Sequence, residues 1–161
     1  MAANKVLRMG DEMYLYYDGG NWTHGFNAKW FGQPRTITRE GKPYTWTYKR
    51  AIGLAKWRLD RFVAAEADEH GGTITTVPLT FAGLNLELNA RTRDGGSIVV
   101  ELLDESGVPI EEFAQSDAIT GDGLRLPVPF PAGDLAAIAG QPVLVRFHLK
   151  NAELYSFAFR E

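Results

Sequence analysis

Apolar and polar residues alternate through most of the chain after Gly71. Leu84, Leu86 and Leu88 alternate with Asn85, Glu87 and Asn89. A period of two places such sets on opposite faces of a β-strand. The same alternation predicts seven strands in this part of the chain: Thr73–Val77, Asn85–Arg91, Ser97–Leu103, Val108–Phe113, Leu124–Phe130, Val143–Leu149 and Leu154–Phe159.

Turn residues separate these strands. Asp94-Gly95-Gly96 predicts a hairpin between its two neighbours, and Lys150–Glu153 predicts a turn between the last two strands. The one convincing helical turn is Asp134–Ala139, with Asp134 as its cap and Gly140 at its end. Short strands with almost no helix predict an all-β fold, an antiparallel, jelly-roll-like β-sandwich spanning residues 63–161.

Residues 1–62 have a different character, because they hold all four tryptophans and five of the six tyrosines. Glu12–Tyr17 predicts a strand, followed by a turn or loop at Asp18–Asn21. The alternation in Arg50–Asp60 favours a strand over a helix. Between them we expect a long loop with a short hairpin at Thr36–Thr47, turning on Glu40–Pro43. This region is therefore an aromatic-rich hairpin and loop extension of the sandwich.

Composition excludes several classes of function. The chain has no cysteine, so disulfides and thiolate chemistry are absent. Its net charge is −3 and it has no basic run, so we expect no nucleic-acid partner. No apolar stretch is long enough to cross a bilayer, so no membrane partner is expected. Residues 1–10 have no apolar signal core, and the chain as given carries no signal peptide.

The aromatic region is the strongest candidate for binding. Sugars stack their C–H faces on Trp and Tyr rings, while nearby polar groups bind their hydroxyls. The candidate polysaccharide-binding residues are Tyr17, Trp22, His24, Trp30, Tyr44, Trp46 and Tyr48. The alternative is that these rings pack against another domain or a second copy of the chain, because exposed aromatic patches mark interfaces in general.

Candidates for catalysis and metal binding are sparse. The three histidines are far apart and show no ligand spacing. Asp18 and Glu40 are the carboxylates of the aromatic region that could serve glycoside hydrolysis, although a turn explains Asp18 equally. Asp117 and Asp122, with Gly121 between them and Gly123 after them, could hold a structural calcium ion, or simply form a turn. We therefore expect no catalytic residue and no obligatory cofactor.

Several segments resemble a known family. The stretch Val6–Gly20, which contains MGDEMYLYYDGG, is similar to the last blade of a five-bladed β-propeller, together with Thr23–Gly25 (THG), Ile52–Ala55 (IGLA) and Arg58–Val63 (RLDRFV). The propellers are those of secreted bacterial proteins similar to glycoside hydrolase families 32 and 43. Segments of the C-terminal part, such as Pro142–Leu149, resemble the β-sandwich that follows the propeller in that family.

The resemblance implies a secreted or extracytoplasmic, carbohydrate-associated module whose catalytic carboxylates would lie in earlier blades. Two departures stand out: Asp18 is inserted in the family-like YYGG, and Arg61 replaces the glycine of DGF. Three functions remain open. The chain is a non-catalytic module that binds polysaccharide, or an interaction module that forms homo-oligomers or packs on a propeller, or a glycoside hydrolase or a fragment of one.

Overall fold

The computed structural model of the protein describes residues 5–21, 33–47 and 49–161. The chain forms two compact units, Met1–Leu59 and Asp60–Glu161, each of which is described by itself. All strand pairs of the described residues are antiparallel. The predicted all-β, sandwich-like class is confirmed, while the jelly-roll-like arrangement stays a prediction.

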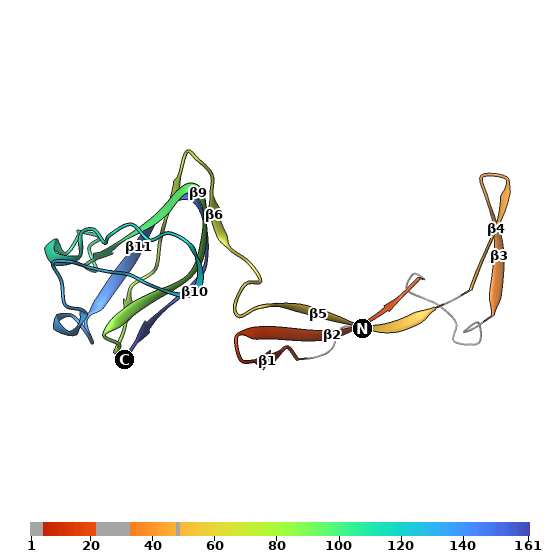
Figure 1. Ribbon diagram of the computed structural model, residues 1–161, viewed down its shortest axis with the longest axis horizontal. Helices are drawn as coiled ribbons and strands as arrows, with labels where there is room; N and C mark the ends of the chain where they lie inside the picture. The colour runs from red at the N-terminus through yellow and green to blue at the C-terminus, as the bar shows by residue number, and fades with distance from the viewer. Residues whose placement is uncertain (1–4, 22–32, 48) are drawn as a thin grey trace. The chain divides into compact units, whose positions relative to one another are not determined.

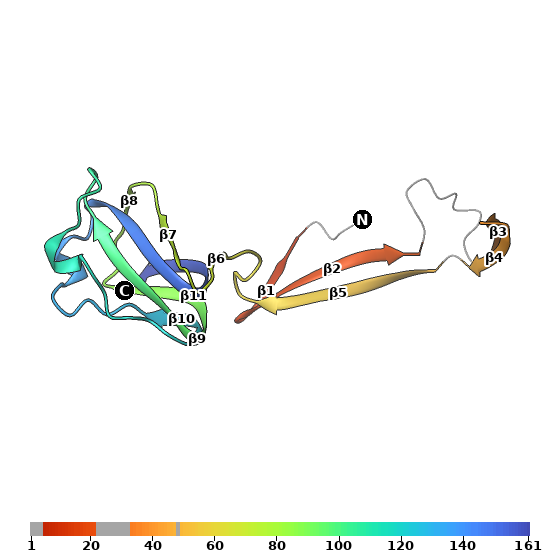
Figure 2. The ribbon, with the colours of Figure 1, turned by 90° about the horizontal axis from the view of Figure 1, so that it is seen from above.

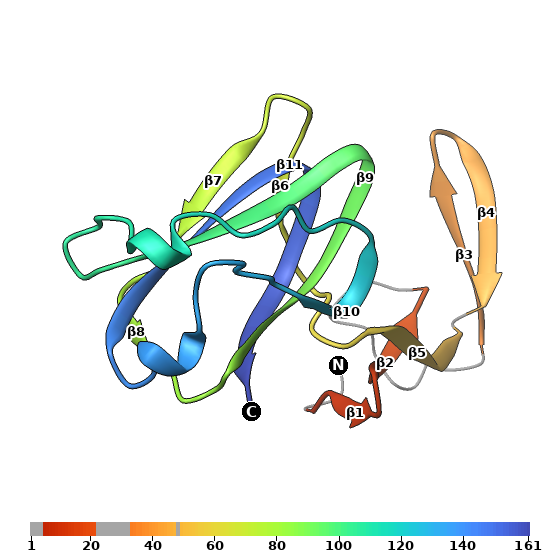
Figure 3. The same cartoon turned by 60° about the vertical axis from the view of Figure 1, so that its left-hand side comes forward.

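Two long strands form the centre of the second unit, β9 (Asn85–Leu103) and β11 (Pro142–Arg160). They pair from Leu103↔Leu144 to Asn85↔Arg160 and curve strongly together (Figure 3). Shorter strands pair with them. Strand β10 (Asp122–Pro127) lies beside β9. Three others lie beside β11: β6 (Ala65–Ala67), β7 (Gly72–Thr75) and β8 (Leu79–Thr80).

The core of this unit follows from the alternation in β9 and β11. Leu86, Leu88, Val100, Val145 and Phe147 are at most 1% exposed, and they belong to one continuous cluster of buried residues. Both halves of each long strand contribute to the cluster, so the curved pair encloses its own apolar face. Burial of alternate residues in this way is what stabilises a sandwich.

The predicted turns at Asp94–Gly96 and Lys150–Glu153 are wrong, because both segments lie inside continuous strands. Ser97 pairs with Lys150 and Thr92 with Ala152, so four residues of β9 face only Asn151. The extra residues form a bulge, in which Gly95 has a φ of 69° and Asn151 a φ of 42°. The local turn signal is used to bend the paired strands rather than to end them.

Two smaller elements show one success and one error. The 3-10 helix Leu135–Ala137 begins as predicted, since the Asp134 side chain accepts a hydrogen bond from the Ala136 N–H at 3.0 Å. The predicted strand Val108–Phe113 is wrong beyond its first residues. Pro109 forms an isolated bridge with Leu103, and Glu111–Phe113 is a 3-10 helix that buries Phe113. In the described residues, no helix has the length and hydropathy to cross a membrane.

The first unit contains a three-stranded sheet in the order β1 (Leu7–Met9), β2 (Glu12–Gly20), β5 (Arg50–Arg58) (Figures 1 and 2). The predicted strand at Arg50–Asp60 is confirmed as β5. The turn predicted to begin at Asp18 is wrong, because Asp18, Gly19 and Gly20 pair with the start of β5 and extend β2.

The predicted hairpin is confirmed as β3 (Pro34–Arg39) and β4 (Lys42–Thr47). Its two turn residues, Glu40 and Gly41, have φ angles of 53° and 75°. Positive φ at both positions is the requirement of a type I′ turn, which matches the twist of a hairpin. Glycine adopts this conformation freely, whereas Glu40 adopts it at a cost.

The first unit has no core of its own among the described residues. In β1 to β5 every described side chain is exposed or half-buried, whereas all the fully buried side chains lie from Ala67 onward. An isolated ribbon of this kind is marginally stable in water. The rich apolar composition of these strands is therefore not explained by packing within the unit.

Candidate functional site

One face of the β3–β4 hairpin gathers aromatic and cationic side chains. Side chains directly opposite each other in an antiparallel pair share a face. The three pairs Arg35↔Trp46, Ile37↔Tyr44 and Arg39↔Lys42 therefore lie on one face. The other face is formed mainly by threonines, of which Thr36 and Thr45 share a hydroxyl hydrogen bond of 2.5 Å. We call the first face the aromatic hairpin face.

Tyr44 and Trp46 form the centre of the aromatic hairpin face. Their ring centroids are 5.8 Å apart and their planes are inclined by 32°, so the two rings make a shallow platform. Tyr44 is 61% exposed, and Trp46 is half-buried. An open cavity of about 810 Å³ adjoins the rings and is also lined by Ile37, Arg39 and Lys42. This size suits a small ligand or a short stretch of polymer.

The base of the hairpin is held by Asn21, which also borders the cavity. Its side-chain amide donates to the Thr47 carbonyl at 3.0 Å and accepts from the Lys49 N–H at 2.9 Å. Both polar atoms of the side chain are therefore used by the backbone. Asn21 acts as a structural clamp at this position rather than as a ligand-binding group.

Three of the predicted sugar-binding residues lie in the described part of the chain, and the structure brings two of them together, Tyr44 and Trp46. Tyr17 lies on β2, where its ring covers Gly53 of β5 so closely that an added Cβ there would lie 2.4 Å from the Tyr17 Cζ. Packing across the strand pair accounts for that tyrosine. The other four predicted residues lie outside the described residues: Trp22, His24, Trp30 and Tyr48.

The two carboxylates proposed for hydrolysis are used structurally. Asp18 forms an ion pair with Arg50 from the neighbouring strand, and this hydrogen-bonded partner lowers the pKa of Asp18. A general acid needs the opposite shift, so Asp18 is suited to permanent ionisation. Glu40 occupies the first position of the type I′ turn. Each residue therefore has a non-catalytic explanation.

The two aspartates proposed for calcium binding, Asp117 and Asp122, have different partners. The Asp122 carboxylate lies 2.7 Å from the Arg61 guanidinium, and a fixed cation there competes with a metal ion. Asp117 is exposed, and its N–H donates to the Pro129 carbonyl at 3.0 Å. Within the described residues, no three His, Cys, Asp or Glu side chains are grouped to hold a metal ion. Structural calcium stays a prediction.

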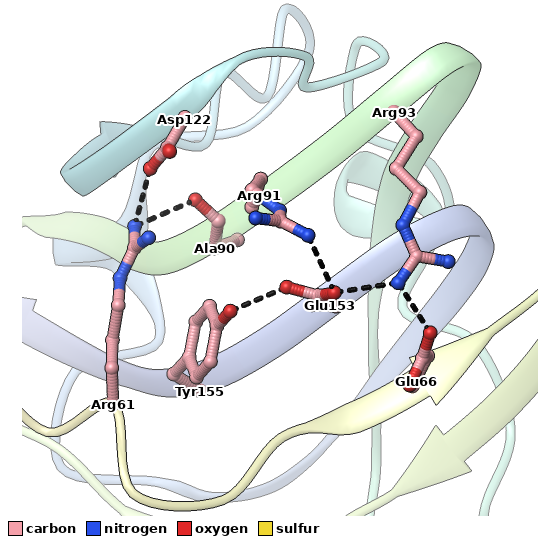
Figure 4. Close-up of polar contacts among 8 residues, drawn as sticks. All are labelled: Arg61, Glu66, Ala90, Arg91, Arg93, Asp122, Glu153 and Tyr155. Carbon is pink, nitrogen blue, oxygen red and sulfur yellow. Dashed lines mark hydrogen bonds and ion pairs between the residues drawn. The ribbon is translucent and has the colours of Figure 1, made fainter.

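A cluster of polar side chains lies in the sandwich and is shown in Figure 4. Arg61 lies at its edge, with a side chain only 9% exposed. It donates to Asn89 Oδ1 at 2.9 Å and to the carbonyls of Ala90 and Gly123 at 3.2 and 3.1 Å. Its guanidinium carbon also lies 4.6 Å from the centre of the Tyr155 ring. Arg61 thus fastens the start of the sandwich to β9 and β10.

The rest of the cluster is centred on Glu153, which is 8% exposed. Its carboxylate binds Arg91 at 3.0 Å and Arg93 at 2.7 Å, and it accepts a hydrogen bond from the Tyr155 hydroxyl (Figure 4). The Tyr155 bond and the two arginines lower the pKa of Glu153, while burial and the nearby carboxylate raise the pKa of Tyr155. The two ion pairs link β9 to β11.

Sequence reasoning missed the role of Arg61. Arg61 replaces the glycine of the family-like motif, and the positive φ of this segment, 59°, is at Asp60. What the structure uses at residue 61 is the side chain. No local signal pointed to this role, because the acceptors of Arg61 lie 28 to 62 residues away in the sequence.

His148 belongs to a smaller cluster on the exposed side of β11. Its ring nitrogens lie 2.9 Å from Glu101 Oε1 and 3.3 Å from Thr73 Oγ1. Arg146 binds the other oxygen of Glu101 at 2.9 Å. Since His148 is 44% exposed and its partners are neighbouring side chains of the same sheet, the cluster serves as cross-strand pairing.

Comparison with family models, with curated proteins and with solved structures finds no match. The resemblance to glycoside hydrolase propellers, and the secreted or extracytoplasmic location that it implies, therefore stay predictions.

Proposed function

We propose that this protein is a non-catalytic, carbohydrate-associated β-sandwich module that binds polysaccharide on the aromatic hairpin face. The observation that carries the proposal is the platform of Tyr44 and Trp46. It is solvent-facing and adjoins a cavity bordered by polar and charged side chains. The sandwich has its own core. The clusters around Glu153 and Glu101 link its neighbouring strands.

The arrangement matches the two chemical faces of a sugar ring. Tilted aromatic rings offer a large apolar area at low conformational cost, since each has only two rotatable side-chain bonds. Arg39 and Lys42, at the tip of the same face, supply donors for hydroxyl oxygens. The spacing of 5.8 Å between the rings suits contact with adjacent sugar units of a chain rather than with one buried sugar.

We expect Trp46→Ala to weaken polysaccharide binding about tenfold or more, because a lost aromatic contact is worth roughly 1.5 kcal/mol or more. Affinity electrophoresis over a panel of soluble polysaccharides, followed by calorimetry on the best ligand, measures the effect. Thr38→Ala, on the opposite face of the same hairpin, is the matched control and should bind normally. Failure of the intact protein to bind any polysaccharide would refute the proposal.

A second function is favoured by a separate observation on the β1–β2–β5 sheet. One of its faces exposes Leu7, Met9, Tyr16, Ile52 and Leu54, between 43% and 80% each. The opposite face carries a further apolar set: Met13, Leu15, Tyr17, Ala55 and Trp57. The first face also carries the Asp18–Arg50 and Glu12–Lys56 ion pairs. Large apolar side chains on both faces of one sheet are typical of a sheet that packs against other elements. We infer that it is an interaction surface for further β-sheet, in this chain's copies or in a propeller.

Self-association through this sheet has a direct test. We expect the protein to form dimers or larger species whose mass, measured by light scattering, rises with concentration. Ile52→Asp should return it to a monomer, because a charge on the 80% exposed Ile52 is costly to bury in an interface. Val77→Asp, a change at a 78% exposed valine of the sandwich, is the control. A monomer at all concentrations with freely quenched Trp fluorescence would exclude this packing.

A further inference from the structure

We propose that the polysaccharide bound by the aromatic hairpin face is anionic, carrying carboxylate or sulfate groups on its sugar rings. This inference rests on the proposed function and specifies its ligand class. It starts from the distribution of charge between the two units, which the overall net charge of −3 conceals.

The two units carry opposite charge. Residues 1–59 contain ten lysines and arginines and four acidic residues, a net charge of +6. Residues 60–161 contain seven lysines and arginines and sixteen acidic residues, a net charge of −9. Because charges of one sign attract ligands of the other and raise their rate of association, the first unit is suited to an anion and the sandwich is not.

The positive charge is also concentrated at the platform. Arg35, Arg39 and Lys42 share the aromatic hairpin face with Tyr44 and Trp46. Arg39 and Lys42 are exposed and line the cavity, and neither forms a salt bridge with any described residue. Glu40, in the turn, is the one carboxylate among the described residues bordering the cavity. Two cations thus face the cavity with their charge uncompensated by a salt bridge.

This combination discriminates among polymers. A neutral polysaccharide would use the rings but would leave Arg39 and Lys42 without a charged partner. Carboxylate and sulfate oxygens bind guanidinium and ammonium groups through charge-assisted hydrogen bonds. A nucleic acid is less suited, since its affinity depends on many phosphate contacts and this face offers three cations. The observations therefore favour an acidic glycan.

The test compares polymers that differ only in charge. One pair is fully methyl-esterified against de-esterified homogalacturonan, and the other is dextran against dextran sulfate. We expect the intact protein to bind at least one charged member about tenfold more tightly than its neutral partner at low salt. At 1 M salt, where the Debye length is about 3 Å, the preference should fall below about twofold. The two pairs also distinguish carboxylate from sulfate as the recognised group.

Variants connect the preference to the site. Arg39→Gln with Lys42→Gln should abolish the preference, because the charged polymer loses both of its cationic partners and its affinity falls to about that of the neutral polymer. Trp46→Ala should weaken binding of both polymers. Lys150→Gln with Arg160→Gln removes two charges from the sandwich and should change neither affinity.

The outcomes separate the two proposals. Equal binding of charged and neutral polymers that is lost in Trp46→Ala overturns the anionic preference and leaves the proposed function intact. A preference unaltered by Arg39→Gln with Lys42→Gln also overturns it, since the recognising charges would lie elsewhere. Binding of single-stranded DNA as tight as that of the charged glycan overturns the glycan assignment. Absence of binding to every polymer overturns both proposals.

Discussion

Arg61→Ala should destabilise the sandwich by about 3 kcal/mol, which is a large fraction of the stability of a domain of this size. The guanidinium is 9% exposed and has four partners besides the Tyr155 ring: Asn89 Oδ1, the carbonyls of Ala90 and Gly123, and the Asp122 carboxylate. Alanine would remove the donors and leave a gap beside these acceptors. Asp122 is 46% exposed and can be rehydrated, so most of the loss comes from the carbonyl contacts.

The measurement requires a probe of the sandwich itself. All four tryptophans lie before residue 60, so Trp fluorescence reports on the first unit. Urea unfolding followed by circular dichroism should show a lower midpoint with an unchanged slope. Arg160→Ala is the matched control, because Arg160 is 60% exposed and its closest carboxylate, on Glu87, lies 3.8 Å away. It should cost less than about 0.5 kcal/mol. Equal midpoints for both variants would contradict the anchoring role of Arg61.

Gly96→Ala should destabilise the sandwich by a similar amount, about 3 kcal/mol. A Cβ on Gly96 would lie 2.4 Å from the Asn151 carbonyl oxygen, 2.8 Å from that of Lys150 and 2.9 Å from that of Arg93. All three are backbone atoms and none can rotate away. Since this position lies in the bulge where β9 and β11 bend together, relief of the clash requires displacement of the paired strands.

The neighbouring Gly95 separates the effect of space from that of backbone conformation. Gly95 has a φ of 69° and nothing within 4 Å of its built Cβ, so Gly95→Ala strains only the backbone. We expect a loss of about 1 kcal/mol there. Thermal unfolding followed by circular dichroism compares the two variants. If Gly96→Ala proves no worse than Gly95→Ala, the close approach of the two strands is not a constraint on the fold.

The candidate site was only partly predictable. Clustered aromatic residues predicted a binding surface, and the turn at Glu40–Pro43 predicted, at Thr36–Thr47, the hairpin that carries Tyr44 and Trp46. The same reasoning grouped Tyr17 with them, although its ring packs over Gly53. Aromatic composition alone does not show which rings share a face, since that depends on the strand with which each one pairs.

The charge of the site was available in the sequence but was hidden by averaging over the chain. The net charge of −3 and the lack of a basic run argued against a nucleic-acid partner, whereas the boundary after Leu59 divides the charge into +6 and −9. Charge distribution becomes informative only when the residues that share a folded unit are known, because fields are screened within roughly 8 Å at physiological salt.

By itself, the sequence determined the all-β class, most of the strands, the hairpin and the capped turn at Asp134. Each depends on periodicity of two or on a side chain that binds its own backbone, and such interactions lie within a few residues. The tertiary structure alone decided that Asp94–Gly96 is a bulge rather than a turn, that Asp18 extends a strand, and that Arg61 is buried. Those outcomes depend on partners 28 to 62 residues away, which no local pattern specifies.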